Sequence, residues 1–266
     1  WVTQEQVAAA IRPDTALILC ETPANPTLQL VGIESLVKQA KEIPVLVDST
    51  FATPILQNPV VQGAAMVLHS CTKFIGGHGD VMAGVIACSN EWAQRLRQVR
   101  ILTGANVHPT AAYTLHRGLQ TLPIRVLAAQ KNATELCQRL LQHPTVETVL
   151  FPGLPECDPN SVVGTQMNGP GTMISFVLKD GYDAARDVMA AVKLITPAVS
   201  LGSCDTLIQH PAGLTHRIVD QEALKTSGIV PGLLRLSVGI EDCEDLWSDL
   251  NSALNNALIT ELLSAK

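Results

Sequence analysis

The sequence predicts an α/β protein with two units: a larger unit built on a mostly parallel sheet, then a smaller α+β unit. Short apolar runs alternate with helical patterns over the first half of the chain, as in the right-handed strand–helix–strand units of parallel sheets. After Pro144 the alternation is less regular, which favours an antiparallel sheet. The 266 residues are 47% hydrophobic and 16% charged, a composition typical of globular proteins with a large buried core.

The first unit is predicted to begin with a short helix. Thr3 is a candidate N-cap for this helix, which ends before Pro13. Further strands are expected at 16–20, 43–47 and 81–88, and helices are expected at 33–41, 91–100 and 110–119. Another apolar run is expected to form a buried strand and ends in His69-Ser70-Cys71-Thr72-Lys73.

The second unit is predicted to follow a long amphipathic helix over about 124–142. We therefore expect domains at 1–123 and 124–266. The expected strands of the second unit are 146–150, 173–178 and 233–238, and its expected helices are 182–192 and 244–263.

Charge and cysteine content exclude several classes of protein. The net charge is −6 and no long basic run occurs, so we expect no binding to nucleic acid or to a membrane surface. No apolar run approaches the length of a membrane span. The seven cysteines are widely spaced without a CxxC pair, which argues against a zinc site or a disulfide framework. Reduced thiols in a cytoplasmic protein are the simpler interpretation.

Reactive side chains follow two of the predicted strands. Asp48 ends one apolar run, and Lys73 follows the next, flanked by the hydroxyls of Ser70 and Thr72. Ligands of open α/β sheets bind beyond the carboxyl ends of the strands, so these residues are expected to share a site. A lysine amine can form a Schiff base with a carbonyl. Pyridoxal phosphate (PLP) offers an aldehyde for the lysine, a ring nitrogen for an acid and a phosphate for the hydroxyls.

Each of these residues alone is more often structural. A lysine after a strand is commonly solvated, and an aspartate there is commonly a helix cap or a turn former. Arg235 lies within the apolar run LLRLSVG and needs a partner, since an unpaired buried charge is costly. That partner is either a structural acid or the carboxylate of a ligand, unless the run is an edge strand from which the arginine reaches solvent. The combination of residues, more than any single one, indicates a catalytic site.

Several motifs carry a resemblance to a known family. ETPANP, VDST, HSCTKFIGGHGD, VSLG, QHPAGLTH and RLSVGIED resemble the PLP-dependent enzymes of cysteine and methionine metabolism. GHGDVMAG and LITPAVSLGSCDTLIQHP are most similar to the methionine γ-lyases of that family. The resemblance implies a three-layer, aminotransferase-like domain of fold type I, followed by the small domain. It also implies that the large domain is N-terminally incomplete, because family members carry a further portion before the first helix.

The resemblance implies roles for eight residues. Lys73 is the implied catalytic residue, which binds the cofactor and moves protons. The other implied cofactor-binding residues are Asp48, Ser70, Thr72, Asn25 and Thr50. Arg235 and Ser200 are implied to hold the carboxylate of the substrate, and no metal is expected.

The implied reaction is carbon–sulfur bond cleavage by γ-elimination on L-methionine or a related sulfur amino acid, giving a 2-oxo acid, ammonia and a thiol. Alternatives within the family are a cystathionine γ-synthase, a cystathionine γ-lyase and a homoserine-ester sulfhydrylase. An alternative of another class is a truncated chain without activity. The resemblance also implies a homo-oligomer, either a dimer or a tetramer, in the cytoplasm.

Overall fold

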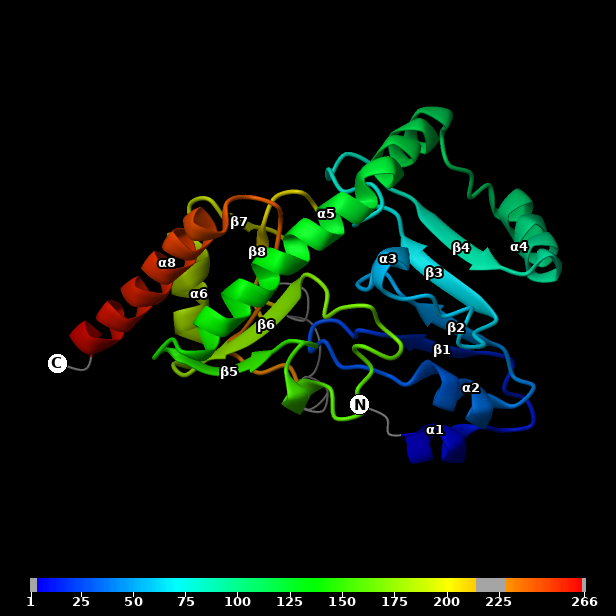
Figure 1. The fold of residues 1–266 in the computed structure, drawn as a ribbon, viewed down its shortest axis with the longest axis horizontal. Helices are drawn as coiled ribbons and strands as arrows, with labels where there is room; N and C mark the ends of the chain where they lie inside the picture. Colours follow the sequence, from blue (N-terminus) through cyan, green and yellow to red (C-terminus); the bar gives the residue numbers. More distant parts are fainter. Residues whose placement is uncertain (1–3, 214–227, 265–266) are drawn as a thin grey trace.

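A computed structural model describes residues 4–213 and 228–264, with side chains described from Glu5 to Asn256. Two sheets make up the molecule, and one long helix runs diagonally from the first sheet to the second (Figure 1). This arrangement confirms the predicted α/β class. Thr3 and the last three residues of the motif QHPAGLTH lie outside the described residues.

The first sheet has four strands in the order β1-β2-β3-β4, and four helices accompany it. Strands β1, β2 and β3 are parallel to one another, whereas β4 is antiparallel to β3, so the sheet is mostly parallel as predicted. The strands are β1 (Ile18–Glu21), β2 (Val45–Asp48), β3 (Met66–Ser70) and β4 (Gly84–Cys88). The helices are α1 (Gln4–Ala10), α2 (Ile33–Ala40), α3 (Thr53–Leu56) and α4 (Asn90–Thr103).

Helix α2 shows why the sequence forms a crossover between two parallel strands. Its buried residues Ile33, Leu36 and Ala40 lie on one face, as expected for a helix that covers a sheet. They pack against Val45 and Val47 of β2 in one hydrophobic cluster. Burial of this face holds β1 and β2 parallel, and their last residues therefore end at the same edge of the sheet.

Helix α5 (Pro109–Leu141) is one continuous helix of 33 residues. The prediction of two separate helices, at 110–119 and 124–142, was therefore wrong. The predicted domain boundary at 123/124 falls inside this helix, and the division into two domains stays a prediction.

The continuity of α5 has a physical reason. Pro123 lacks an N–H, so the helix loses one internal hydrogen bond at this point. Leu122 and Val126, one on each side of the proline, are buried in the same hydrophobic cluster, and Ala133 and Leu136 are buried in the next. Packing along this stripe stabilises the helix through the proline, as tertiary contacts commonly override local propensity.

The second sheet has five strands in the order β5-β6-β9-β8-β7. All of its pairings are antiparallel except that of β7 with β8, which fits the predicted α+β unit. The strands are β5 (Val146–Leu150), β6 (Met173–Leu178), β7 (Thr196–Pro197), β8 (Leu207–Gln209) and β9 (Leu233–Ser237). The helical segments are η1 (Pro155–Cys157), α6 (Gly181–Ala191) and α8 (Cys243–Ser264). The short strands β7 and β8 were not predicted.

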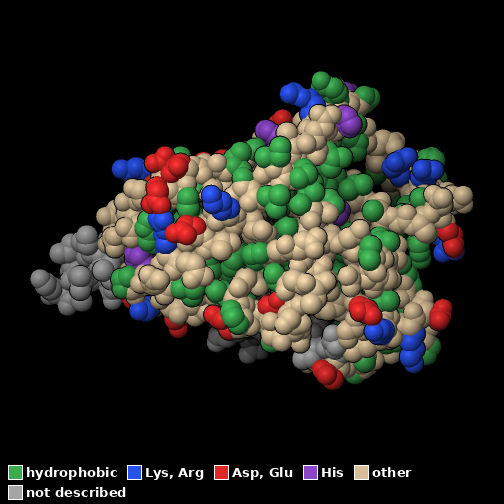
Figure 2. Space-filling model, in the orientation of Figure 1, with side chains coloured by type: hydrophobic (Ala, Val, Ile, Leu, Met, Phe, Trp, Pro, Cys, Tyr) green, Lys and Arg blue, Asp and Glu red, His purple; other side chains and the backbone are tan. Residues whose placement is uncertain are grey.

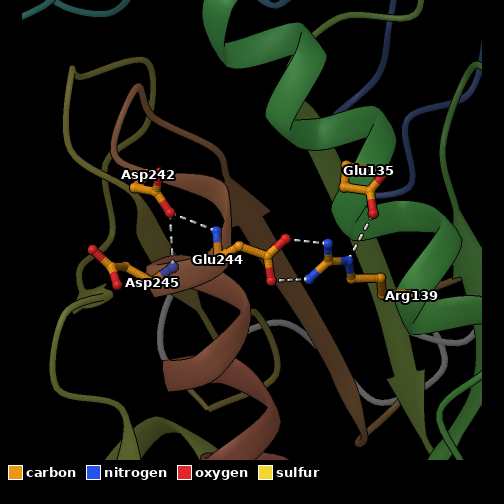
Figure 3. Close-up of polar contacts among 5 residues, drawn as sticks. All are labelled: Glu135, Arg139, Asp242, Glu244 and Asp245. Carbon is orange, nitrogen blue, oxygen red and sulfur yellow. Dashed lines mark hydrogen bonds and ion pairs between the residues drawn. The ribbon is translucent and has the colours of Figure 1, made fainter.

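The core of this second unit lies between the sheet and its helices. Phe176 of β6, Leu234 of β9 and Leu250 of α8 belong to a single cluster of buried residues. Figure 3 shows that an ion pair also connects α8 to α5. Arg139 of α5 donates to both carboxylate oxygens of Glu244 and, through Nε, to Glu135 Oε1 at 2.7 Å.

The surface carries charges of both signs. On the face drawn in Figure 2, basic and acidic side chains are interspersed, and hydrophobic side chains are visible along its middle. Within residues 4–213 and 228–264, the structure contains no helix with the length and apolar character needed to span a membrane.

Candidate active site

The carboxyl edge of the first sheet gathers three polar residues. Glu21, Asp48 and Ser70 are the last residues of β1, β2 and β3, and Glu21 pairs in register with Asp48. Asp48 Oδ1 accepts hydrogen bonds from the Thr50 backbone N–H at 3.0 Å and from the Thr50 hydroxyl at 2.6 Å. Thr50 Oγ1 accepts in turn from the backbone N–H of Ser70 at 2.9 Å. These bonds fix the Asp48 carboxylate beside the start of the loop that carries Lys73.

Lys73 lies three residues after β3, and its backbone N–H donates to Ser70 O at 3.1 Å. The Lys73 ammonium donates to Ser200 Oγ at 3.0 Å, across 127 residues of sequence. Burial, and then the positive charge of Arg235, lower the pKa of Lys73 below its ordinary value. A lysine of this kind is closer to the neutral amine that attacks a carbonyl than a solvated lysine is.

Arg235 enters the site from the middle of β9 in the second sheet. Its side chain is buried; Nη1 donates to Asn25 Oδ1 at 2.7 Å and Nη2 to Ser200 O at 2.9 Å. Burial lowers the pKa of Arg235 to about 10, so the guanidinium keeps its charge at neutral pH.

The guanidinium of Arg235 can donate further hydrogen bonds. Its Nε is buried without a hydrogen-bond partner, and no carboxylate of the described residues forms an ion pair with it. A buried cation in this condition is suited to an incoming carboxylate. The structural ion pair considered from the sequence is therefore not found among the described residues.

Seven of the eight residues singled out in the sequence join one of two linked groups. Lys73, Ser200, Arg235 and Asn25 form one chain of contacts. Asp48, Thr50 and Ser70 form the other, and the two meet at the backbone bond from Lys73 to Ser70. The eighth residue is treated separately below.

Thr72 lies beside the site, but its hydroxyl is already engaged. Its Oγ1 accepts from the backbone N–H of Ala83 at 3.1 Å and lies 3.4 Å from Ala83 O. These bonds connect the loop that carries Lys73 to the segment just before β4. A phosphate would have to share this hydroxyl with Ala83, so the predicted role of Thr72 stays a prediction.

Two residues at the site were missed in the sequence. Glu21 Oε2 accepts from the Asn25 backbone N–H at 3.1 Å, and burial raises the pKa of Glu21. His69 is buried next to Asp48, and burial lowers its pKa, which favours the neutral ring. Glu21 had a signal, since it ends a strand that neighbours the strand of Asp48. His69 had none beyond its place two residues ahead of Cys71 in a buried run.

Comparisons with known proteins identify the family of this chain. The family model described as "Cys/Met metabolism PLP-dependent enzyme" matches residues 2–255. The chain belongs to this family. It is 53% identical to an L-methionine gamma-lyase of Brevibacterium sandarakinum over 255 residues, which cover 96% of this chain and 64% of that protein. It is 50% identical to an L-methionine gamma-lyase of Streptomyces avermitilis, with 100% and 60% covered.

A solved structure supports the fold. The crystal structure of cystathionine gamma synthase from Xanthomonas oryzae, in complex with aminoacrylate and cysteine, superposes with a TM-score of 0.93 at 38% identity. That match covers 97% of this chain and 68% of the other. The chain spans less than two thirds of the length of the two curated relatives named above.

The residues of the site fit the family's cofactor in type. A lysine of lowered pKa suits the aldehyde of PLP, Asp48 suits its ring nitrogen, and the Ser70 hydroxyl suits its phosphate. No group of three or more His, Cys, Asp or Glu residues in the described part of the chain is arranged to hold a metal ion.

Proposed function

We propose that this chain carries the lysine and the carboxylate receptor of a PLP-dependent carbon–sulfur lyase acting by γ-elimination on L-methionine or a related sulfur amino acid. The observation that carries the proposal is the meeting of Lys73 and Arg235 at Ser200. Lys73 Nζ donates to the hydroxyl of Ser200, and Arg235 Nη2 donates to its carbonyl. An amino acid held here by its carboxylate has its Cα close to an amine that can move a proton.

The proposed roles follow from the positions of the side chains. Arg235, with Ser200, binds the substrate carboxylate, and Lys73 takes the proton from Cα. PLP, when bound, supplies the electron sink that makes this proton acidic. Asp48 is proposed to hold a proton on the ring nitrogen and Asn25 to contact the ring hydroxyl. Thr50 is proposed to lie near the ring, and Ser70 and Thr72 to bind the phosphate.

The overall change balances as an elimination followed by hydrolysis. One proton leaves Cα and one leaves Cβ, and the bond from Cγ to sulfur breaks. The sulfur takes one proton and leaves as a thiol, and Cγ takes the other. Water then releases ammonia and a 2-oxo acid. Two relatives at 50–53% identity carry the name L-methionine gamma-lyase, which supports methionine as the substrate.

The test is to supply the purified chain with PLP and L-methionine and to measure thiol and 2-oxo acid together. We expect equal amounts of both products, and none from Lys73→Ala, because no other lysine in the described part of the chain donates to Ser200. Lys193→Ala is the matched control, since Lys193 is exposed on a different part of the chain and should leave the rate unchanged. Full activity in Lys73→Ala would contradict the proposed mechanism, and a wild-type chain without turnover would favour the inactive alternative.

A second candidate is γ-replacement, as in a cystathionine γ-synthase. It is favoured by the similarity to the Xanthomonas oryzae structure. A synthase would join cysteine to an activated homoserine ester and release little thiol from methionine. Cystathionine γ-lyase and homoserine-ester sulfhydrylase activities are distinguished in the same assay by supplying cystathionine, or a homoserine ester with sulfide.

We further propose that the protein is a cytoplasmic homo-oligomer, a dimer or a tetramer. Helix α4 has no buried residue, and Ile101 and Leu102 are 72% and 86% exposed. Ile124 of α5 is 72% exposed, and a second copy of the chain would cover such apolar surface. All seven cysteines are free, which suits a reducing compartment. Sedimentation at the mass of a single chain would contradict the oligomer.

A further inference from the structure

The loop that follows Lys73 accepts hydrogen bonds from a buried arginine of α5. Arg125 is only 7% exposed. Its Nη1 donates to Phe74 O at 2.8 Å, its Nη2 to Gly118 O at 2.7 Å, and its Nε to Thr121 Oγ1 at 3.0 Å. Its Nη2 also donates to Ile75 O at 3.4 Å. Among the described residues no carboxylate forms an ion pair with Arg125, so neutral oxygen atoms are its hydrogen-bond acceptors.

Two glycines permit this close approach. Gly77 has φ +74°, and a Cβ there would lie 2.1 Å from Arg125 Nη1. Gly118 faces the loop from α5, and a Cβ there would lie 2.4 Å from Ile75 O. Both distances are far below van der Waals contact. A side chain at Gly118 would meet the backbone of the loop and push the helix and the loop apart, whereas a side chain at Gly77 would displace the guanidinium of Arg125.

The other side of the loop contacts the segment that carries Ser200. A Cβ at Gly202 would lie 2.7 Å from the backbone nitrogen of Phe74. The backbone N–H of Cys204 donates to Gly77 O at 2.9 Å. The loop Phe74–Gly77 is therefore held between α5 and residues 200–204. Its position sets where Lys73 lies relative to Ser200.

We infer that Arg125 is a positioning residue for Lys73: its guanidinium fixes the loop Phe74–Gly77 and thereby holds the lysine amine at Ser200. Arg125 forms no hydrogen bond with Lys73 or Ser200, so it acts through the loop. Arginine suits this task because its planar group directs donors toward several acceptors at once. A lysine at this position has one ammonium and cannot reach Phe74 O, Gly118 O and Thr121 Oγ1 together. The consequence for catalysis rests on the proposed function, whereas the positioning itself does not.

The first test is amide hydrogen exchange in the chain without cofactor. The amides of Gly76 and Gly77 donate to Cys71 O and Lys73 O, both at 2.8 Å, so they report on the loop. We expect Arg125→Lys to speed their exchange by roughly ten-fold or more, since at least one bond from a charged donor is lost. Thr121→Val should have a smaller effect and Arg125→Met a larger one. Exchange in β6 and β9 should stay unchanged.

The matched control is Arg117→Met, which removes an exposed arginine from the same helix. It should leave exchange of the loop unchanged. Loop exchange at the wild-type rate in Arg125→Lys would overturn the inference, and so would an equal increase across both sheets, which indicates a general loss of stability. If Arg125→Met does not fold, Arg125→Lys and Thr121→Val still decide the question.

The second test follows Lys73 itself. Release of the loop should expose Lys73 to water, so its pKa should rise toward the ordinary lysine value. The pH dependence of its reaction with an amine reagent, measured for each lysine by mass spectrometry, reports this change. We expect a shift to higher pH at Lys73 in Arg125→Lys and no shift in Arg117→Met; an unchanged Lys73 profile would overturn the inference. A wild-type chain that fails to cleave methionine would end the proposed function but leave both tests valid.

Discussion

At the scale of single residues, the site is organised around the charge of Arg235, which forms no ion pair within the described residues and is attracted by the charge of Glu21. Arg235 is buried, its charge faces neutral partners, and one of its N–H groups has no acceptor. Such a group costs stability unless a ligand completes it. Burial, and then the positive charge of Arg235, lower the pKa of Lys73, so the residue proposed to bind the substrate carboxylate also favours the neutral lysine amine.

Replacing Arg235 with lysine tests the carboxylate receptor. We expect kcat/KM for L-methionine to fall by roughly 10- to 100-fold, because hydrogen bonds to charged groups contribute about 1.5–3 kcal/mol. For a substrate in which an alcohol replaces the carboxylate, the same substitution should lower kcat/KM much less, because an alcohol cannot bind all the donors of the guanidinium. Arg186→Lys, at an exposed arginine of α6, is the matched control. An equal loss for both substrates would mean that Arg235 acts on the fold instead.

At the scale of elements, α5 joins the two sheets, and an ion pair connects its C-terminal end to α8. Arg139 is half-buried and contacts the exposed carboxylates of Glu135 and Glu244 (Figure 3). Its guanidinium also lies over the Trp247 ring. Ion pairs of this type contribute little and are screened by salt. The hydrogen bond from Arg139 lowers the pKa of Glu244.

The sign of this shift gives a pH dependence. A carboxylate whose pKa is lowered in the folded state stabilises the fold above its ordinary pKa, and this contribution is lost as the pH falls through the lowered value. Glu244→Gln should therefore lower Tm slightly at pH 7. The difference from wild type should vanish in acid and shrink at high salt.

Thermal unfolding at several pH and salt values measures this difference. Glu91→Gln is the control, because its pair with Arg95 lies within α4 and joins no second element. A difference in Tm that persists unchanged in acid would show that the ion pair is not its cause.

At the scale of the whole molecule, local patterns predicted the elements better than their connections. The strands at 146–150 and 173–178 agree with β5 and β6, since their apolar runs are bounded by turn residues. The continuity of α5 through Pro123 was not predictable, because it depends on packing between segments far apart in sequence. The strands β7 and β8 were missed because they are two and three residues long and carry too little pattern.

The same contrast between local patterns and contacts over long sequence distances applies to the site. Asp48 and Lys73 were predicted to share an edge, since both follow parallel strands. The contacts of Lys73 with Ser200 and of Arg235 with Asn25 cross 127 and 210 residues, so only the resemblance to a family suggested them. Arg125 gave a weak signal, as a charged residue within LPIRVLAA, but its acceptors are backbone carbonyls that no sequence pattern marks.

The most direct measurement of the central claim is to add PLP to the chain, reduce it with borohydride and map the labelled lysines by mass spectrometry. We predict that the cofactor is attached at Lys73 far more than at the exposed Lys41 and Lys193. We also predict that the label disappears in Lys73→Ala. Labelling of Lys73 no stronger than that of Lys41 and Lys193 would contradict the claim that the two sheets assemble a PLP site around this residue.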